Sequence, residues 1–222
     1  MDFLNNYKKQ IEWKASDNLV GFDDAHSFMK NRVEDIIVKK ERDMIWLLEH
    51  QDVYTAGVSA KDSDLIKTTD IPIIKTNRGG KYTYHGPGMK IIYTMLDLKK
   101  IFYPNRPDIA RFVKFLEEWI IDILAEYDIP GEIRKDRVGI WVKTGKTEKK
   151  IAAIGIKIRK WVSYHGIAIN LDPDLSKFNN IIPCGINEFG VTSLQNMGVD
   201  DFKDINELII NKFYERLAKF KT

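Results

Sequence analysis

The stretch GIWVKTGKTEKKIAAIGIKIRKWVSYHGIAINLD, residues 139–172, decides the predicted fold. It contains strand-like segments at 139–143, 150–158 and 162–172. The charged TGKTEK between the first two segments is typical of a hairpin turn, so we expect these two strands to pair. Two glycines, Gly155 and Gly166, interrupt neighbouring segments, and a glycine inside a strand indicates either a bulge or the close approach of a ligand or backbone.

Outside this stretch, strand-like and helical segments are mixed without strict βαβ alternation. We expect helices over about 22–40, over 107–127 with Pro107 in its first turn, and from about Asp204 onward. One apolar strand is predicted within DMIWLLEHQDVYTAG (43–57), which runs out into a loop at Gly57, and further strands are predicted at IPIIKT (71–76) and MKIIYTML (89–96). This order predicts the α+β class, with a mixed β-sheet flanked by helices.

The bulk composition predicts a single domain over residues 1–222, since no repeat or linker interrupts the chain. The net charge of +3 is too small to indicate nucleic-acid binding, although it suits an acidic protein partner. The N-terminal MDFLNNYKKQIEW has no apolar run of the length that a signal or membrane segment needs. A single cysteine excludes an intramolecular disulfide, so the cytoplasm is the expected compartment.

The glycine-rich segment RGGKYTYHGPG, residues 78–88, predicts a binding loop. A phosphate-binding Walker loop needs Ser or Thr after its lysine, and here Tyr82 follows Lys81. A dinucleotide site needs its glycines between a strand and a helix, whereas this segment runs into the strand-like 89–96. The loop is therefore expected to receive a ligand other than phosphate.

Cys184, the only cysteine, lies in PCGI at 183–186. A lone cysteine is most often a small buried side chain, but a Pro–Cys–Gly turn can present a thiol to a cleft. A nearby cation would then lower the pKa of the thiol and make it nucleophilic. Lys150, at the start of the segment 150–158, is the candidate cation, although a lysine at a strand end is more often a solvated edge charge.

The histidines leave two alternatives open. His85 and His165 both follow a tyrosine and precede a glycine, and each is either a structural hydrogen-bonded residue or part of a site. His26 falls in a charged helical segment and is expected at the surface, and His50 has no assigned role. None has the spacing of a zinc motif such as H-E-x-x-H, so no metal site is predicted.

Several of these segments together resemble the lipoyl(octanoyl) transferase family, the octanoyltransferases of lipoate biosynthesis. The matching segments follow the order of the family along most of the chain: YTAG (54–57), NRGGKYTYHGPG (77–88), GIWV (139–142), KIAAIGIKI (150–158), SYHGIAIN (163–170), PCGI (183–186) and GVTSL (190–194). One departure is that Met89 and Lys90 stand where the family usually has Gln and an apolar residue.

The resemblance implies a fold shared with biotin and lipoate protein ligases and a catalytic dyad of Cys184 and Lys150. It also implies a pocket for the acyl group. The implied substrate-binding residues are Arg78, Gly79, Gly80, Lys81, Tyr82, Thr83, Tyr84, His85, Ala153, Ile154, Gly155, Gly166, Ile167 and Ala168.

The same resemblance implies a reaction without a cofactor. The octanoyl group would pass from octanoyl-acyl carrier protein to Cys184 as a thioester. It would then pass to a lysine of the lipoyl domains of 2-oxoacid dehydrogenases or of the glycine cleavage H protein. The alternatives are an ATP-dependent lipoate or biotin protein ligase of the same fold and a non-catalytic binding module in which Cys184 is merely buried.

Overall fold

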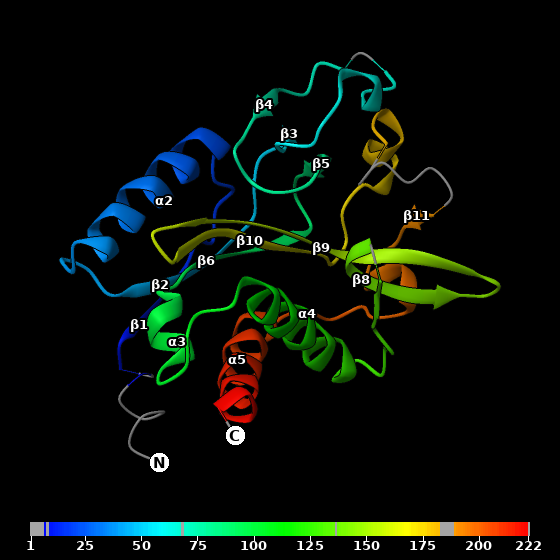
Figure 1. Cartoon of the computed structure of the whole chain (residues 1–222). Helices are drawn as coiled ribbons and strands as arrows, with labels where there is room; N and C mark the ends of the chain where they lie inside the picture. The colour runs from blue at the N-terminus through cyan, green and yellow to red at the C-terminus, as the bar shows by residue number, and fades with distance from the viewer. Residues whose placement is uncertain (1–6, 8, 68, 136, 183–188, 222) are drawn as a thin grey trace.

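The structure, a computed structural model, describes residue 7 and residues 9–67, 69–135, 137–182 and 189–221. The strands of its main sheet are β1 (Ile11–Ala15), β2 (Asp43–Leu48), β6 (Met89–Met95), β7 (Glu132–Arg134), β8 (Arg137–Thr144), β9 (Thr147–Arg159), β10 (Val162–Asn170) and β11 (Gly190–Val191). They form an eight-stranded sheet of order β1-β2-β6-β10-β9-β8-β7, with β11 paired to β9 (Figure 1). The β1–β2 and β9–β11 pairs are parallel and the other pairs antiparallel, as the predicted mixed sheet requires.

A second, three-stranded sheet lies above the main one in Figure 1. Its strands are β3 (Val53–Ala56), β4 (Ile73–Lys75) and β5 (Tyr82–His85), in the order β4-β3-β5. The prediction of one strand within 43–57 is wrong, because β2 ends at Leu48 in the main sheet and β3 begins at Val53 in the small one. Between the two strands, His50 makes an isolated bridge with Val20.

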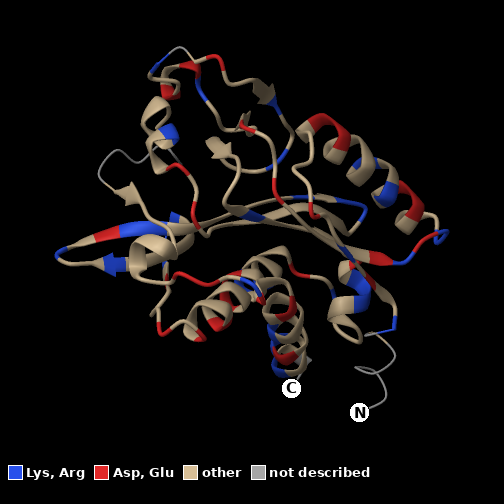
Figure 2. Ribbon diagram, turned by 180° about the vertical axis from the view of Figure 1, so that it is seen from behind, with Lys and Arg blue, Asp and Glu red and all other residues tan. Residues whose placement is uncertain are grey.

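The helices cover both faces of the main sheet (Figure 1). They are α2 (Phe22–Ile37), α3 (Leu98–Phe102), α4 (Ile109–Ala125) and α5 (Ile205–Lys221), with short 3-10 turns η1 (Asp62–Asp64), η2 (Leu175–Asn180) and η4 (Gln195–Met197). One apolar core joins α4 and α5 to the sheet, and a second core joins α2 and the small sheet to the opposite face. Charged residues of both signs lie on the long helices and on the β8–β9 hairpin (Figure 2). This arrangement confirms the predicted α+β class.

Helix α4 illustrates how sequence signals set an element's start. The Asp108 side chain accepts a hydrogen bond from the Arg111 backbone N at 3.0 Å, so Asp108 caps the helix. Pro107 therefore precedes the cap and does not lie in the first turn as predicted. Buried in the core, the Trp119 indole donates to the Ile209 carbonyl of α5 at 3.0 Å. Ile109, the first residue of the helix, is exposed.

The β8–β9 hairpin and the β9–β10 pair form as the segment 139–172 predicts. Thr144 lies opposite Thr147 at the hairpin turn. Along β9 and β10, Gly155 lies opposite Gly166 and Ala153 opposite Ala168. The face of these strands that is turned toward the small sheet carries the candidate site.

Candidate active site

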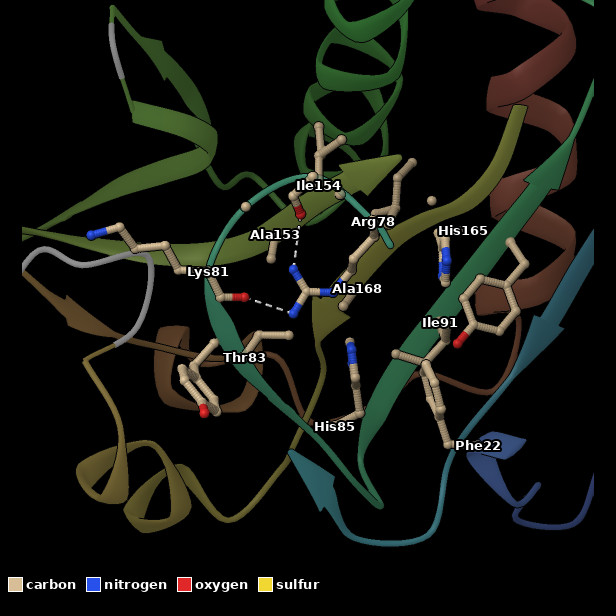
Figure 3. A pocket seen from close by; sticks show the side chains of 17 residues that line it. Phe22, Arg78, Lys81, Thr83, His85, Ile91, Ala153, Ile154, His165 and Ala168 are labelled. Atoms are coloured by element: carbon tan, nitrogen blue, oxygen red, sulfur yellow. Dashed lines mark hydrogen bonds between the residues drawn. The ribbon is translucent and has the colours of Figure 1, made fainter. Parts of the chain in front are cut away.

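A cavity lies between the main sheet and the loop that precedes β5, and its empty space of about 530 Å³ includes part of the open solvent at its mouth. Its lining comes from α2, the loop, β5, β6, β9 and β10 (Figure 3): Phe22, Arg78, Gly79, Gly80, Lys81, Tyr82, Thr83, His85, Ile91, Tyr93, Ala153, Ile154, Gly155, His165, Gly166, Ile167 and Ala168. The structure therefore brings all of the expected substrate residues except Tyr84 around one cavity.

Tyr84 points to the other side of β5, because successive side chains of a strand alternate between its faces. Its hydroxyl donates a hydrogen bond to the Asp52 carboxylate at 2.6 Å, and its ring packs edge-on against Phe178. Burial and the hydrogen bond to Asp52 raise the pKa of Tyr84. The structure thus corrects the expectation for this residue: it braces β5 from behind and does not line the cavity.

Arg78 holds the glycine-rich loop in place. Its buried guanidinium donates to the Thr55 carbonyl at 2.7 Å, to the Gly79 carbonyl at 2.9 Å and to the Lys81 carbonyl at 2.8 Å. These bonds tie the loop to β3 and keep the backbone at 79–81 against the cavity (Figure 3). The Lys81 ammonium lies 4.0 Å from the Asp64 carboxylate, outside the cavity.

Gly155 and Gly166 differ in which neighbouring atoms a side chain at each position would meet. A Cβ atom built on Gly166 would lie 2.0 Å from the Ile92 carbonyl oxygen of the neighbouring strand β6, which no side chain can tolerate. A Cβ atom on Gly155 would lie 3.2 Å from the Gly79 carbonyl oxygen and 3.3 Å from the Arg78 Cδ. Gly166 is therefore required by the packing of the sheet, whereas a Cβ atom at Gly155 would need the glycine-rich loop to give way by only a few tenths of an ångström.

A second cavity, of about 290 Å³, adjoins the first and shares Thr83 and Ala153 with it. Lys150 lines this second cavity and is only 5% exposed. Its ammonium donates to the Val138 carbonyl at 2.9 Å and lies 4.8 Å from the centre of the Trp141 ring. Lys150 is thus not the solvated edge charge that its place at a strand end allowed.

Met89, the departure from the family pattern, lines the same second cavity as Lys150. Lys90 lies on the opposite face of β6, because residues alternate along the strand, and its ammonium is 3.8 Å from the Glu49 carboxylate. Glu49 also accepts a hydrogen bond from the Gly88 backbone N at 2.8 Å. The departure at position 89 therefore affects the cavity, whereas the lysine at position 90 pairs with Glu49 away from it.

Cys184 lies outside the described residues, which end at Ile182 and resume at Phe189. Before the gap, the Ile182 backbone N donates to the Asp64 carbonyl at 2.7 Å. After the gap, Val191 pairs with Lys150 in the parallel β9–β11 register. The predicted dyad therefore stays a prediction, although the chain that follows Cys184 returns to the strand position of Lys150.

All four histidines of the chain gather at one end of the cavity, two of them in its lining. The ring centres of His26 and His165 are 5.4 Å apart, and those of His50 and His85 are 5.9 Å apart. Phe22 lies among them, with its ring centre 5.3 Å from that of His50. The prediction that His26 is a surface residue is wrong in part, because its ring is half-buried against this cluster.

Burial keeps these imidazoles neutral. It lowers the pKa of His50 to about 4 and that of His165 to about 3, and it lowers the pKa of His85 well below the ordinary value. His165 has a φ of 59°, a left-handed conformation that histidine adopts more readily than most residues. The Nδ1 atom of His85 is buried without a hydrogen-bond partner among the described residues.

Sequence reasoning missed three lining residues: Phe22, Ile91 and Tyr93. Ile91 and Tyr93 are alternate residues of the predicted strand 89–96, so the alternation of strand faces was an available signal for them. Phe22 gave no such signal, because only the tertiary packing of α2 brings its first residue to the cavity.

No helix in the described part of the chain combines the length and apolar character that crossing a bilayer demands. Nor does the described part contain a group of three or more His, Cys, Asp or Glu side chains arranged to hold a metal ion.

Comparison with known proteins gives consistent results. The family model described as the lipoyl protein ligase A/B catalytic domain matches residues 23–218. A curated octanoyltransferase of Wolbachia sp. subsp. Brugia malayi is 46% identical over 207 residues, covering 92% of this chain and 98% of the relative. One from Ehrlichia chaffeensis is 44% identical and covers 95% of this chain and 97% of the relative.

Among solved structures, a bi-partite lipoate protein ligase from Thermoplasma acidophilum has a TM-score of 0.69 at 15% identity. The match covers 94% of this chain and 84% of that chain. At this identity the likeness concerns the fold alone, and it confirms the predicted ligase-like architecture.

Proposed function

Because the chain belongs to the lipoyl protein ligase A/B catalytic domain family, we propose that it works through a thioester on Cys184 assisted by Lys150. The chain is an octanoyltransferase that acts in protein lipoylation. The proposal concerns how it does so: which side chain carries the acyl group, which cation assists it, and where the acyl chain lies.

The observation that carries the proposal is a buried ammonium at one end of a cavity lined mainly by apolar groups. Lys150 lines the second cavity, which shares the lining residues Thr83 and Ala153 with the first. A cation in a buried site interacts strongly with a nearby thiolate, because little water screens it. The hydrogen bond to Val138 holds this cation at the end of the cavity.

The reaction balances with these two groups and no cofactor. The Cys184 thiolate attacks the octanoyl thioester, and the carrier thiolate leaves with a proton from the Lys150 ammonium. The amine of the acceptor lysine then attacks the octanoyl–Cys184 thioester, and the neutral Lys150 amine takes the proton that the acceptor loses. The Cys184 thiolate leaves, which restores the ion pair.

We further propose that the donor is octanoyl-acyl carrier protein and that the acceptors are lipoyl domains of 2-oxoacid dehydrogenases and the glycine cleavage H protein. The exchange of one thioester for another is nearly neutral in energy, and amide formation from a thioester is downhill, so ATP is not needed. The net charge of +3 suits acidic partners. The chain acts as one domain over residues 1–222, in the cytoplasm.

The intact mass of the protein after incubation with octanoyl-acyl carrier protein, without ATP, tests the proposal. We expect one octanoyl adduct that hydroxylamine removes and that Cys184→Ser lacks. Addition of a lipoyl domain should then move the adduct to the acceptor. An adduct on another residue, or transfer that depends on ATP and free octanoate, would contradict the proposal. Asn196→Ser, at an exposed residue that lines neither cavity, serves as the control variant.

A further inference from the structure

The strands under the two cavities form three successive rows of facing residues. At one end, Asn170 pairs with Met89, and both line the second cavity together with Lys150. The middle row consists of Ala153, Ala168 and Ile91, which are consecutive partners on β9, β10 and β6. The far row consists of Gly155, Gly166 and Tyr93, again consecutive partners. The cavities therefore follow the strands from Lys150 toward Tyr93.

Rings close the far end of this path. Phe22 is 6% exposed and is the first residue of α2. Its ring is nearly parallel to that of His85, with an interplanar angle of 11° and centres 6.4 Å apart. The Tyr93 ring lies edge-on to His165, with centres 6.2 Å apart. In Figure 3, Phe22 and His165 lie at the opposite side of the cavity from Lys81 and Thr83. We call Phe22 and Tyr93 the end wall.

A hydrogen-bonded histidine fixes the end wall from behind. The His50 Nδ1 atom lies 2.8 Å from the Val20 carbonyl oxygen, which can only accept, so Nδ1 carries the proton. In the neutral ring Nε2 is then an acceptor, and the Tyr93 hydroxyl donates to it at 2.6 Å. His50 is fully buried. The backbone of Tyr93 is therefore fixed in β6 and its side chain is fixed by the hydrogen bond to His50, so the ring has little freedom to move away from the cavity.

We propose that the end wall formed by Phe22 and Tyr93 sets the length of the acyl chain that the enzyme accepts. This inference rests on the proposed function, which places the thioester at the Lys150 end. Met89 and Tyr93 are four residues apart on β6, which is about 13 Å at 3.3 Å per residue. A terminal methyl group stops about 4 Å short of the wall atoms, which leaves about 9 Å.

An extended octanoyl chain fits this space. Its seven C–C bonds, each about 1.5 Å long, zigzag over about 9 Å from the carbonyl carbon to the methyl group. Two further methylene groups add about 2.5 Å, which would drive the methyl group into Phe22. A shorter chain leaves part of the cavity empty and loses apolar contact. The wall thus discriminates in both directions around eight carbons.

The test is a competition among hexanoyl-, octanoyl-, decanoyl- and dodecanoyl-acyl carrier proteins, read as the masses of acyl groups on the enzyme and on a lipoyl domain. We expect Phe22→Ala to raise the use of decanoyl relative to octanoyl by about tenfold, the usual effect of making room for methylene groups. Phe22→Leu, which keeps the site apolar and better filled, should show a smaller shift in the same direction. Phe22→Trp should favour hexanoyl.

Phe28→Ala is the matched control, because Phe28 lies on the same helix but packs against Trp46 away from the cavity. Its chain-length profile should equal that of the wild type. An unchanged profile in both Phe22→Ala and Phe22→Leu, with octanoyl transfer retained, would refute the end wall while leaving the proposed function intact. Absence of any acyl adduct on wild-type Cys184 would instead refute the proposed function on which the inference rests.

Discussion

Alanine substitutions at Gly155 and Gly166 should separate the packing of the sheet from the binding of the acyl chain. The two glycines face each other on β9 and β10, and both line the cavity. Neither is among the glycines with positive φ in the described chain, so an alanine backbone is not itself strained. The two substitutions add the same methyl group to the same row of the sheet, and only its neighbours differ.

The Gly166→Ala methyl group would lie 2.0 Å from the Ile92 carbonyl oxygen and 3.1 Å from its carbon. Strands β6 and β10 must therefore separate by more than about 1 Å to restore an ordinary contact distance. This separation weakens two or three ladder hydrogen bonds, each with a net contribution of about 1 kcal/mol. We expect a loss of about 3 kcal/mol in the free energy of unfolding. For a protein of this size, that loss lowers the melting temperature by about 6–12 °C.

The Gly155→Ala methyl group meets the Gly79 carbonyl oxygen at 3.2 Å and the Arg78 Cδ at 3.3 Å. A shift of a few tenths of an ångström in the loop relieves both contacts, so the loss of stability should stay below about 1 kcal/mol. The methyl group nevertheless narrows the path of the acyl chain. Single-turnover loading from octanoyl-acyl carrier protein should therefore slow by about tenfold.

Thermal unfolding followed by tryptophan fluorescence, together with the loading assay, checks both expectations. Each variant is the control of the other, because the residue change and the strand row are the same. The reasoning fails if Gly166→Ala melts within about 2 °C of the wild type. It also fails if Gly155→Ala loads octanoyl at the wild-type rate, since the acyl path would then lie elsewhere.

Three further predictions concern individual side chains. Lys150→Met should raise the pKa at which Cys184 is alkylated toward about 8.5 and slow both half-reactions, whereas Lys150→Arg should load octanoyl better than it transfers it. Folding lowers the pKa of His165 from about 6.5 to about 3, so between these pH values the unfolded chain binds more protons than the folded chain. The contribution of this residue to the free energy of unfolding is therefore fully present above pH 6.5 and is lost as the pH falls toward 3. His165→Asn should reduce this slope in urea titrations by about 1.4 kcal/mol per pH unit between pH 6 and 4. Tyr84→Phe removes the hydrogen bond to Asp52 and should cost about 2 kcal/mol of stability, measured by urea unfolding, with an unchanged KM for the octanoyl donor.

The main sheet was predictable where local patterns repeat over many residues. Hairpin turn chemistry gave β8 and β9, and apolar periodicity gave α4 and α5. The transfer of the chain from β2 to β3 was not predictable, because EHQD contains neither glycine nor proline. Only the long-range pairing of the strands, with β2 in the main sheet and β3 in the small one, shows that the chain changes sheets there.

The candidate site was predictable in its residues but not in its geometry. The family segments named most of the lining, and strand alternation would have separated Tyr84 from Thr83 and His85. Sequence could not show that the Arg78 guanidinium is committed to carbonyl groups of the loop and of β3. Nor could it place Phe22 beside the cavity, since that contact depends on how α2 packs across the sheet.

The two ends of the acyl path differ in charge in a way that suits the proposed chemistry. At the Lys150 end, the proposed reaction uses the buried ammonium to stabilise the Cys184 thiolate and to protonate the leaving carrier thiolate. At the end wall, burial lowers the pKa of His50 to about 4 and of His165 to about 3, so both rings are neutral near pH 7 and present no charge to the alkyl chain. A charged imidazole there would hold water around it, and the methyl end of each incoming acyl chain would have to remove that water. Acid should therefore weaken acyl binding as the pH approaches these two pKa values, with the sharpest loss for the longest chain that reaches the wall.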